Sequence, residues 1–211
     1  MQKGKFIVIE GLDGSGKGTQ IKLLCQRLKD AGIKIYPTFE PTSGKIGVLI
    51  REALSGKFKV TQNTIGLMFS ADRTEHNTEI QKALDDGCCV ICDRYYYSTI
   101  AYQGRGSEEQ FLWTCALNLN NSGIRKPDLC VFLDVNPDIC MDRIDTNRDK
   151  KEIYEKADIL REVRSEYQKL FDYMKNIGRN ENITVIPSDG EKNEISDKLF
   201  DAVYKTIVDK A

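Results

Sequence analysis

The feature that most constrains the fold of this chain is a short apolar run followed by a glycine-rich loop and a helical pattern. Residues 6–9 are apolar, and residues 11–19 read Gly-Leu-Asp-Gly-Ser-Gly-Lys-Gly-Thr. Ile21, Leu24 and Leu28 then recur at helical spacing. This order of strand, G-x-x-x-x-G-K loop and helix is typical of a phosphate-binding loop.

The residue types of the loop suit a polyphosphate. Glycines allow a tight turn whose backbone N–H groups converge on phosphate oxygens, and the helix that follows adds its positive end. Lys17 can reach the terminal phosphates, so the sequence predicts binding of a nucleoside triphosphate, ATP. The predicted ATP-binding residues are Gly11, Leu12, Asp13, Gly14, Ser15, Gly16, Lys17, Gly18 and Thr19.

One position departs from the usual motif. Gly18 follows Lys17, where a hydroxyl residue usually binds Mg²⁺, and Thr19 comes one position later. The sequence leaves open whether Thr19 binds the metal or whether water and the phosphates hold it. The ending Gly-Lys-Gly-Thr-Gln resembles nucleoside monophosphate kinases of the adenylate kinase type.

Strand-like and helix-like segments alternate along the whole chain. Apolar runs occur at residues 5–10, 33–39, 88–93, 129–135 and 182–187. Helical faces are formed by Leu160, Val163, Tyr167, Leu170 and Met174, and by Ile195, Leu199, Val203 and Ile207. We therefore predict one α/β domain over residues 1–211, with the three-layer P-loop NTPase fold. It has a five-stranded parallel sheet with helices on both faces, and ligands bind at the carboxyl ends of the strands.

Composition excludes several classes of partner. The net charge is −1, and no apolar run approaches the ~20 residues of a membrane span, so we expect neither nucleic acid nor a membrane as partner. The first predicted strand leaves no room for a signal peptide, and the seven cysteines suit a reducing cytoplasm. Cys89 and Cys92 form a C-x-x-C pattern, but residues three apart on a strand face opposite ways, which argues against a shared metal ion.

Two further motifs carry chemistry. Residues 93–103 read Asp-Arg-Tyr-Tyr-Tyr-Ser-Thr-Ile-Ala-Tyr-Gln directly after a predicted strand, which places Asp93 and Arg94 beside the loop. Asp93 can hold Mg²⁺ through water, and Arg94 offers a planar fork to a phosphoryl group. Phe69 and Arg73 lie four residues apart on one helical face, where they can meet a flat base.

Together these motifs resemble the thymidylate kinase family. The pattern D-R-Y-x-x-S-x-x-A-Y-Q stands at residues 93–103, G-x-D-G-x-G-K at 11–17, and F-x-A-D-R at 69–73. The resemblance extends from about residue 5 to residue 177 and implies transfer of the ATP γ-phosphoryl group to dTMP, with Mg²⁺, in a homodimer. The segments at 62–86 and 107–121 are where we expect an interface.

The resemblance also implies roles for single residues. Phe69 stacks on thymine, Tyr102 lies under the sugar, and Asp13 faces either the 3′-hydroxyl or the phosphate-binding arginine. The implied dTMP-binding residues are Asp13, Phe39, Arg51, Phe69, Arg73, Arg94, Ser98, Thr99, Tyr102 and Gln103. The implied catalytic residues are Lys17, Arg94, Arg143 and Arg148.

The sequence departs from the family pattern in two places. No arginine accompanies Glu40, where many relatives bind the acceptor phosphate, so we assign that role to Arg51. Gly14 stands where some members carry an arginine, and such members supply cations from a lid. The charged segment 145–156 is the expected lid, with Arg143 and Arg148 as its main cations.

Three other functions stay open at this point. The chain could phosphorylate AMP, UMP or CMP; it could act on a deoxynucleoside, with Glu10 or Glu40 as the base; or it could bind nucleotide as a switch. The single histidine, His76, lies in a polar helical stretch, and we expect it at the surface.

Overall fold

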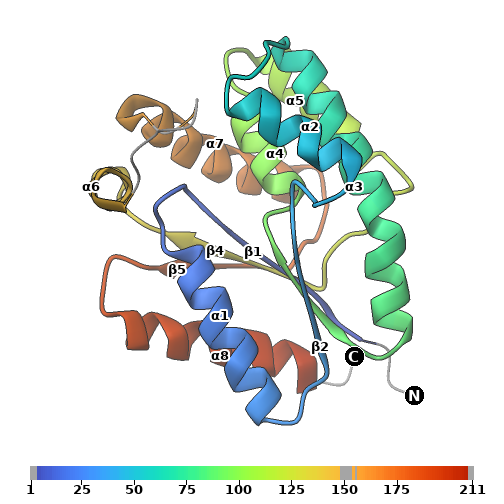
Figure 1. Cartoon of the computed structure of the whole chain (residues 1–211), viewed down its shortest axis with the longest axis vertical. Helices are drawn as coiled ribbons and strands as arrows, with labels where there is room; N and C mark the ends of the chain where they lie inside the picture. Colours follow the sequence, from blue (N-terminus) through green and yellow to red (C-terminus); the bar gives the residue numbers. More distant parts are fainter. Residues whose placement is uncertain (1–3, 148–153, 155, 209–211) are drawn as a thin grey trace.

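The computed structural model describes residues 4–147, 154 and 156–208, and its centre is a parallel sheet (Figure 1). Five strands pair in the order β2-β3-β1-β4-β5, and every pairing is parallel. The strands are β1 (Phe6–Gly11), β2 (Ile35–Phe39), β3 (Cys89–Asp93), β4 (Leu129–Asp134) and β5 (Ile183–Pro187). Each lies within one residue of an expected boundary, except that β2 begins two residues later.

Helices cover both faces of this sheet (Figure 1). They are α1 (Lys17–Asp30), α2 (Lys45–Leu54), α3 (Gln62–Asp85), α4 (Tyr96–Gln103), α5 (Glu108–Leu119), α6 (Pro137–Asn147), α7 (Ala157–Asn176) and α8 (Lys192–Val208). The two helices α1 and α8 pack on one face, while α3, α4 and α7 lie on the other. This is the predicted α/β fold.

Strand alternation divides the core into two clusters. Ile7 and Ile9 of β1 face α1 and α8, while Phe6 and Val8 face α3, α4 and α7. The predicted apolar face of α7 is fully buried. Of the four residues predicted for the apolar face of α8, only Ile207 is partly exposed. Because β1 is central and buried on both faces, its sequence is a continuous apolar run instead of an alternating one.

The sheet brings three loops to one edge. β1 ends at the glycine-rich loop, β3 ends at Asp93, and β2 ends at Phe39, which pairs with Asp93 across the sheet. Ile9 pairs with Asp93 from the other side. Among the described residues, none of the helices combines the length and the apolar character that a membrane span requires.

Candidate active site

The glycine-rich loop follows β1 and turns directly into α1. Gly11, Gly14 and Gly16 have positive φ angles of 152°, 79° and 85°, a region that other residues rarely adopt. A Cβ atom at Gly14 would lie 2.4 Å from the carbonyl oxygen of Cys140 in α6. The close approach of α6 and the positive φ angle therefore leave room only for glycine at position 14.

Lys17 is folded back against the loop. Its Nζ donates hydrogen bonds to the carbonyl oxygens of Gly11 and Leu12, both at 2.9 Å, and the residue is 7 % exposed. Burial, and then the charge of Arg94, lower the pKa of Lys17, while Asp93 and Asp13 oppose this shift. A bound polyanion would stabilise the charged form of this ammonium group, because phosphate oxygens replace the hydration that it loses on burial.

A cavity of about 740 Å³ opens around the loop. We call it the loop cavity. Its lining combines the loop, the end of β3, α6 and the segment after β5: residues 13–20, Lys22, Asp93, Arg94, Arg143, Ile144, Ser188, Gly190, Lys192 and Ile195. The expected ATP-binding residues from Asp13 to Thr19 thus share one cavity; Gly11 and Leu12 instead hold Lys17 through their carbonyl oxygens.

Asp93 suits a metal ion held through water. Its Oδ1 is buried and has no hydrogen-bond partner among the described residues, yet the residue lines the loop cavity beside Lys17. A buried carboxylate oxygen without a partner is costly unless an ion or water completes it, and Mg²⁺ prefers oxygen ligands. Thr19 also lines the loop cavity and is exposed.

Arg143 reaches the loop from α6. Its Nη1 lies 3.4 Å from the carbonyl oxygens of Gly14 and Ser15. The expected lid falls largely outside the described residues, and Arg148 with it. Tyr154 is described, and its hydroxyl accepts a hydrogen bond from Gln103.

A second cavity, of about 240 Å³, lies on the other side of Arg94. We call it the Arg73 cavity. It is lined by Asp13, Glu40, Pro41, Arg51, Leu54, Phe69, Arg73, Arg94, Tyr95, Ser98, Thr99, Tyr102, Gln103 and Tyr154. Nine of the ten expected dTMP-binding residues are in this set, from the glycine-rich loop, α2, α3 and α4, and from the turn between β3 and α4.

Phe39 is the tenth residue, and it does not line the Arg73 cavity. Its side chain is 50 % exposed, whereas the next residue, Glu40, is 5 % exposed and faces the cavity. Side chains alternate along an extended chain, so only one of two neighbours can face inward. Here the inward position belongs to Glu40.

Arg94 and Asp13 line both cavities. Arg94 Nη2 lies 2.5 Å from Asp13 Oδ1, Arg94 Nη1 donates to Ser98 Oγ at 2.8 Å, and Tyr102 donates to Asp13 Oδ2 at 2.9 Å. Burial would raise the pKa of Asp13, but the charges of Arg94 and Lys17 outweigh it and lower that pKa. Both side chains therefore stay ionised at the point where the cavities meet.

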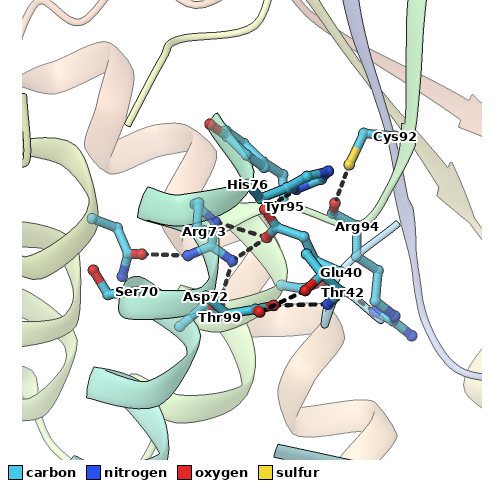
Figure 2. Close-up of polar contacts among 12 residues, drawn as sticks. Glu40, Thr42, Ser70, Asp72, Arg73, His76, Cys92, Arg94, Tyr95 and Thr99 are labelled. Atoms are coloured by element: carbon cyan, nitrogen blue, oxygen red, sulfur yellow. Dashed lines mark hydrogen bonds and ion pairs between the residues drawn. The ribbon is translucent and has the colours of Figure 1, made fainter. Parts of the chain in front are cut away.

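Arg73 is held on three sides, as Figure 2 shows. Its Nε donates to Glu40 Oε2 at 2.8 Å, its Nη1 to Asn118 Oδ1 at 2.5 Å, and its Nη2 to Thr99 Oγ1 at 2.9 Å. The residue is 1 % exposed, and its guanidinium lies over the ring of Tyr95. Such a guanidinium is fixed in advance, so it loses little entropy when a ligand arrives.

The expectation for His76 is wrong. This residue is 3 % exposed, and its Nδ1 lies 3.0 Å from Glu40 Oε1 (Figure 2). Its Nε2 lies 2.7 Å from Thr38 Oγ1. Polar neighbours in the sequence do not by themselves indicate a solvated face. His76 follows Arg73 by three residues and shares its helical face, and that spacing was the signal available in the sequence.

Glu10 is another buried carboxylate that the sequence did not place. It accepts hydrogen bonds from the Ser98 hydroxyl at 2.6 Å, the Tyr167 hydroxyl at 2.8 Å and the Tyr95 N–H at 2.8 Å. Burial raises its pKa, although Arg94 partly opposes this. Glu10 and Glu40 are both fully engaged by protein donors, so neither is placed as a base for a hydroxyl acceptor.

Comparison with known proteins agrees with this geometry. The family model described as "Thymidylate kinase" matches residues 9–198. The chain belongs to the thymidylate kinase family. Its reaction is therefore the phosphorylation of dTMP to dTDP, and kinases of this family take the phosphoryl group from ATP.

Individual relatives cover nearly the whole chain. A probable thymidylate kinase of Methanococcus maripaludis is 37 % identical over 98 % of this chain and 96 % of its own length. One from Methanocaldococcus jannaschii is 42 % identical over 81 % of this chain and 83 % of its own. The solved thymidylate kinase structure from Candida albicans has a TM-score of 0.79 at 28 % identity and covers 96 % of this chain and 92 % of that one.

Proposed function

We propose that the loop cavity holds ATP, that the Arg73 cavity holds dTMP, and that the two phosphate ends meet at Arg94 and Asp13. The observation that carries this proposal is that these two residues line both cavities. Arg94 is the positive group at the junction, and its ion pair with Asp13 fixes where its guanidinium points. Phosphoryl transfer needs alignment and positive charge more than covalent chemistry.

The acceptor nucleotide is recognised at both of its ends. Phe69 stacks on thymine, Arg73 donates to the base, and Tyr102 with Asp13 borders the sugar. Arg51 and Arg94 bind the phosphate, and Ser98, Thr99 and Gln103 complete the wall. The support for this assignment is that all these side chains face one cavity whose arginines are already oriented by protein partners.

The donor nucleotide is held mainly by backbone. Lys17 exchanges its two carbonyl partners for the terminal phosphates, and Arg143 adds a cation from α6. Asp93 would hold Mg²⁺ through water, which supplies charge neutralisation between the phosphates. Thr19 is exposed at the same cavity and can bind the phosphates or the metal's water.

Arg148 would act from the lid when ATP is bound. The closed lid would exclude water and limit hydrolysis of ATP. We expect Arg148→Ala to lower kcat more than it raises KM for dTMP. Steady-state kinetics checks this, and a change confined to KM would contradict a lid role for Arg148.

The substrate assignment is tested with a panel of acceptors. With ATP as donor, dTMP should exceed AMP, UMP and CMP in kcat/KM by at least about tenfold, since base-specific hydrogen bonds give large discrimination. Thymidine should not be phosphorylated, because protein donors already occupy the carboxylates of Glu10 and Glu40, the two candidate bases. A tenfold preference for AMP or CMP, or turnover of thymidine, would overturn the assignment.

We also propose that the chain works as a homodimer in the cytoplasm. Leu67 on α3 is 51 % exposed and Leu112 on α5 is 41 % exposed, and both belong to the segments where we expect an interface. The seven cysteines are free thiols, as a reducing compartment favours. Light scattering should give twice the mass of 24.0 kDa, and Leu67→Glu should give a monomer.

A further inference from the structure

The segment between β2 and α2 is bound tightly to α3 through Asp72. This residue is 3 % exposed, and both of its carboxylate oxygens bind one partner residue, Thr42 (Figure 2). Oδ2 accepts the Thr42 backbone N–H at 2.7 Å, and Oδ1 accepts the Thr42 hydroxyl at 2.7 Å. A buried carboxylate that takes two hydrogen bonds from one residue fixes both the position and the rotation of that residue.

Arg51 of α2 binds the backbone of the same segment through its guanidinium group. Arg51 Nη1 donates to the carbonyl oxygens of Thr42 at 2.6 Å and Pro41 at 2.7 Å. These contacts use Nη1 and leave Nε and Nη2 without a protein acceptor in the part of the chain that the structure describes. Because Arg51 lines the Arg73 cavity, this remaining edge of the guanidinium is the one available to a ligand there.

The packing around Thr42 leaves little freedom for this arrangement to shift. A Cβ atom at Gly47 of α2 would lie 2.0 Å from the Thr42 carbonyl oxygen, so the segment lies directly on that helix. The Thr42 hydroxyl also accepts the Gly44 N–H at 3.1 Å. Thr42 is therefore held between α3 and α2, and its two hydrogen bonds to Asp72 determine the orientation of its carbonyl group.

We propose that Asp72 is a positioning residue for the acceptor phosphate: it fixes Thr42, whose carbonyl, with that of Pro41, orients the guanidinium of Arg51. This rests on the proposed placement of dTMP in the Arg73 cavity. Asp72 and Arg73 are consecutive on α3, so one turn of this helix serves both ends of the nucleotide. Arg73 faces the base directly, and Asp72 acts on the phosphate end through Thr42.

The test compares the affinities of dTMP and thymidine, which differ only in the phosphate, by titration calorimetry. Asp72→Ala should weaken the binding of dTMP about tenfold, because Arg51 then loses one charge-assisted contact with the phosphate. The affinity for thymidine should stay within about twofold of the wild-type value. Asp72→Asn can still accept from one Thr42 donor and donate to its hydroxyl, so it should retain most of the dTMP affinity. Equal weakening of both ligands by Asp72→Ala would show a merely structural role and overturn the proposal.

A double-mutant cycle separates this proposal from the one it rests on. If Asp72 acts through Arg51, the variant with both Asp72→Ala and Arg51→Ala should bind dTMP no more weakly than Arg51→Ala alone. Additive losses would overturn the positioning role. Wild-type affinity for dTMP in Arg51→Ala would instead overturn the placement of the phosphate at Arg51, and the proposal with it.

Two further variants guard against misfolding. Thr42→Val keeps its backbone N–H bond to Asp72 and loses the two hydrogen bonds of the hydroxyl, to Asp72 and from the Gly44 N–H, so it should lower dTMP affinity about threefold and spare thymidine. Ser70→Ala is the matched control, because Ser70 is also buried on α3 but donates to the Leu117 carbonyl oxygen at 3.3 Å, toward α5. The ratio of the two affinities should not change in this control.

Discussion

The loop cavity and the Arg73 cavity are built in opposite ways. The loop cavity depends on one continuous stretch of the chain: the seven consecutive residues from Asp13 to Thr19 all line it, and Lys17 is among them. The Arg73 cavity depends on side chains from several elements, held by one another's hydrogen bonds. A phosphate chain is the same in every nucleotide, so backbone suffices for it, whereas a particular base requires side chains fixed in advance.

Lys17→Ala is expected to have the largest effect on catalysis, and this effect should be confined to the loop cavity. Loss of a cation that stabilises the transferring phosphoryl group should lower kcat by on the order of 1,000-fold. The affinity for dTMP should stay within about twofold, because Lys17 does not line the Arg73 cavity. Steady-state kinetics and calorimetry check this, and a tenfold loss of dTMP affinity would mean that the two cavities are not separate.

Glu40→Gln should lower the free energy of unfolding, because the Arg73 cavity depends on buried, charged side chains. Glu40 is the ion-pair partner of Arg73 in the part of the chain that the structure describes, and Glu40→Gln removes that negative charge from a buried guanidinium, so we expect about 3 kcal/mol of unfolding free energy to be lost. Urea denaturation measures this.

The matched control for Glu40→Gln is Asp197→Asn. Asp197 forms an exposed pair with Arg27 at 2.8 Å, and its side chain is 68 % exposed. This substitution should cost less than about 0.5 kcal/mol. Equal losses in the two variants would refute the view that burial makes the Glu40 pair special.

Phe69→Ala tests whether dTMP binds in the Arg73 cavity and ATP in the loop cavity. Stacking of a base on an aromatic ring contributes about 1–3 kcal/mol, so KM for dTMP should rise about tenfold or more. KM for ATP should not change, because Phe69 lines the Arg73 cavity and not the loop cavity. A rise in both Michaelis constants would contradict the assignment of one nucleotide to each cavity.

Asp13→Asn should show the smallest effect, and one that depends on pH. The pKa of Asp13 is lowered from 3.8 in the folded protein, so its contribution to stability is present above the unfolded pKa and lost as pH falls through the lower folded pKa. The stability difference between wild type and Asp13→Asn should thus be constant from pH 7 to about pH 5 and shrink only below about pH 3.8. A difference that already shrinks near pH 6 would indicate a raised pKa.

The two cavities also differ in how far the sequence predicts them. The loop cavity is encoded by contiguous residues whose spacing has a physical meaning, so the loop, Lys17 and the parallel sheet were all predictable. The positions of Phe69, Arg73 and Arg94 in one cavity followed from the family resemblance.

The partners of these residues were not predictable in the same way. Glu40, Asn118 and Thr99 come from three distant segments, and only the tertiary structure brings them to Arg73. His76 is buried although its sequence neighbours are polar, because a buried polar residue is stable once it is hydrogen-bonded. The outward side chain of Phe39 depends on the register at the end of β2, which an apolar run alone does not fix.

The backbone of Arg94 has a consequence for the engineering of such a protein. Its φ angle is 67°, and it is the one non-glycine residue in the described part of the chain with a positive φ. Glycine adopts this conformation without the roughly 1 kcal/mol that a side chain costs there. Glycine at position 94 would relieve this strain but would also remove the ion pair with Asp13 and the hydrogen bond to Ser98, so any effort to stabilise the protein should leave Arg94 unchanged.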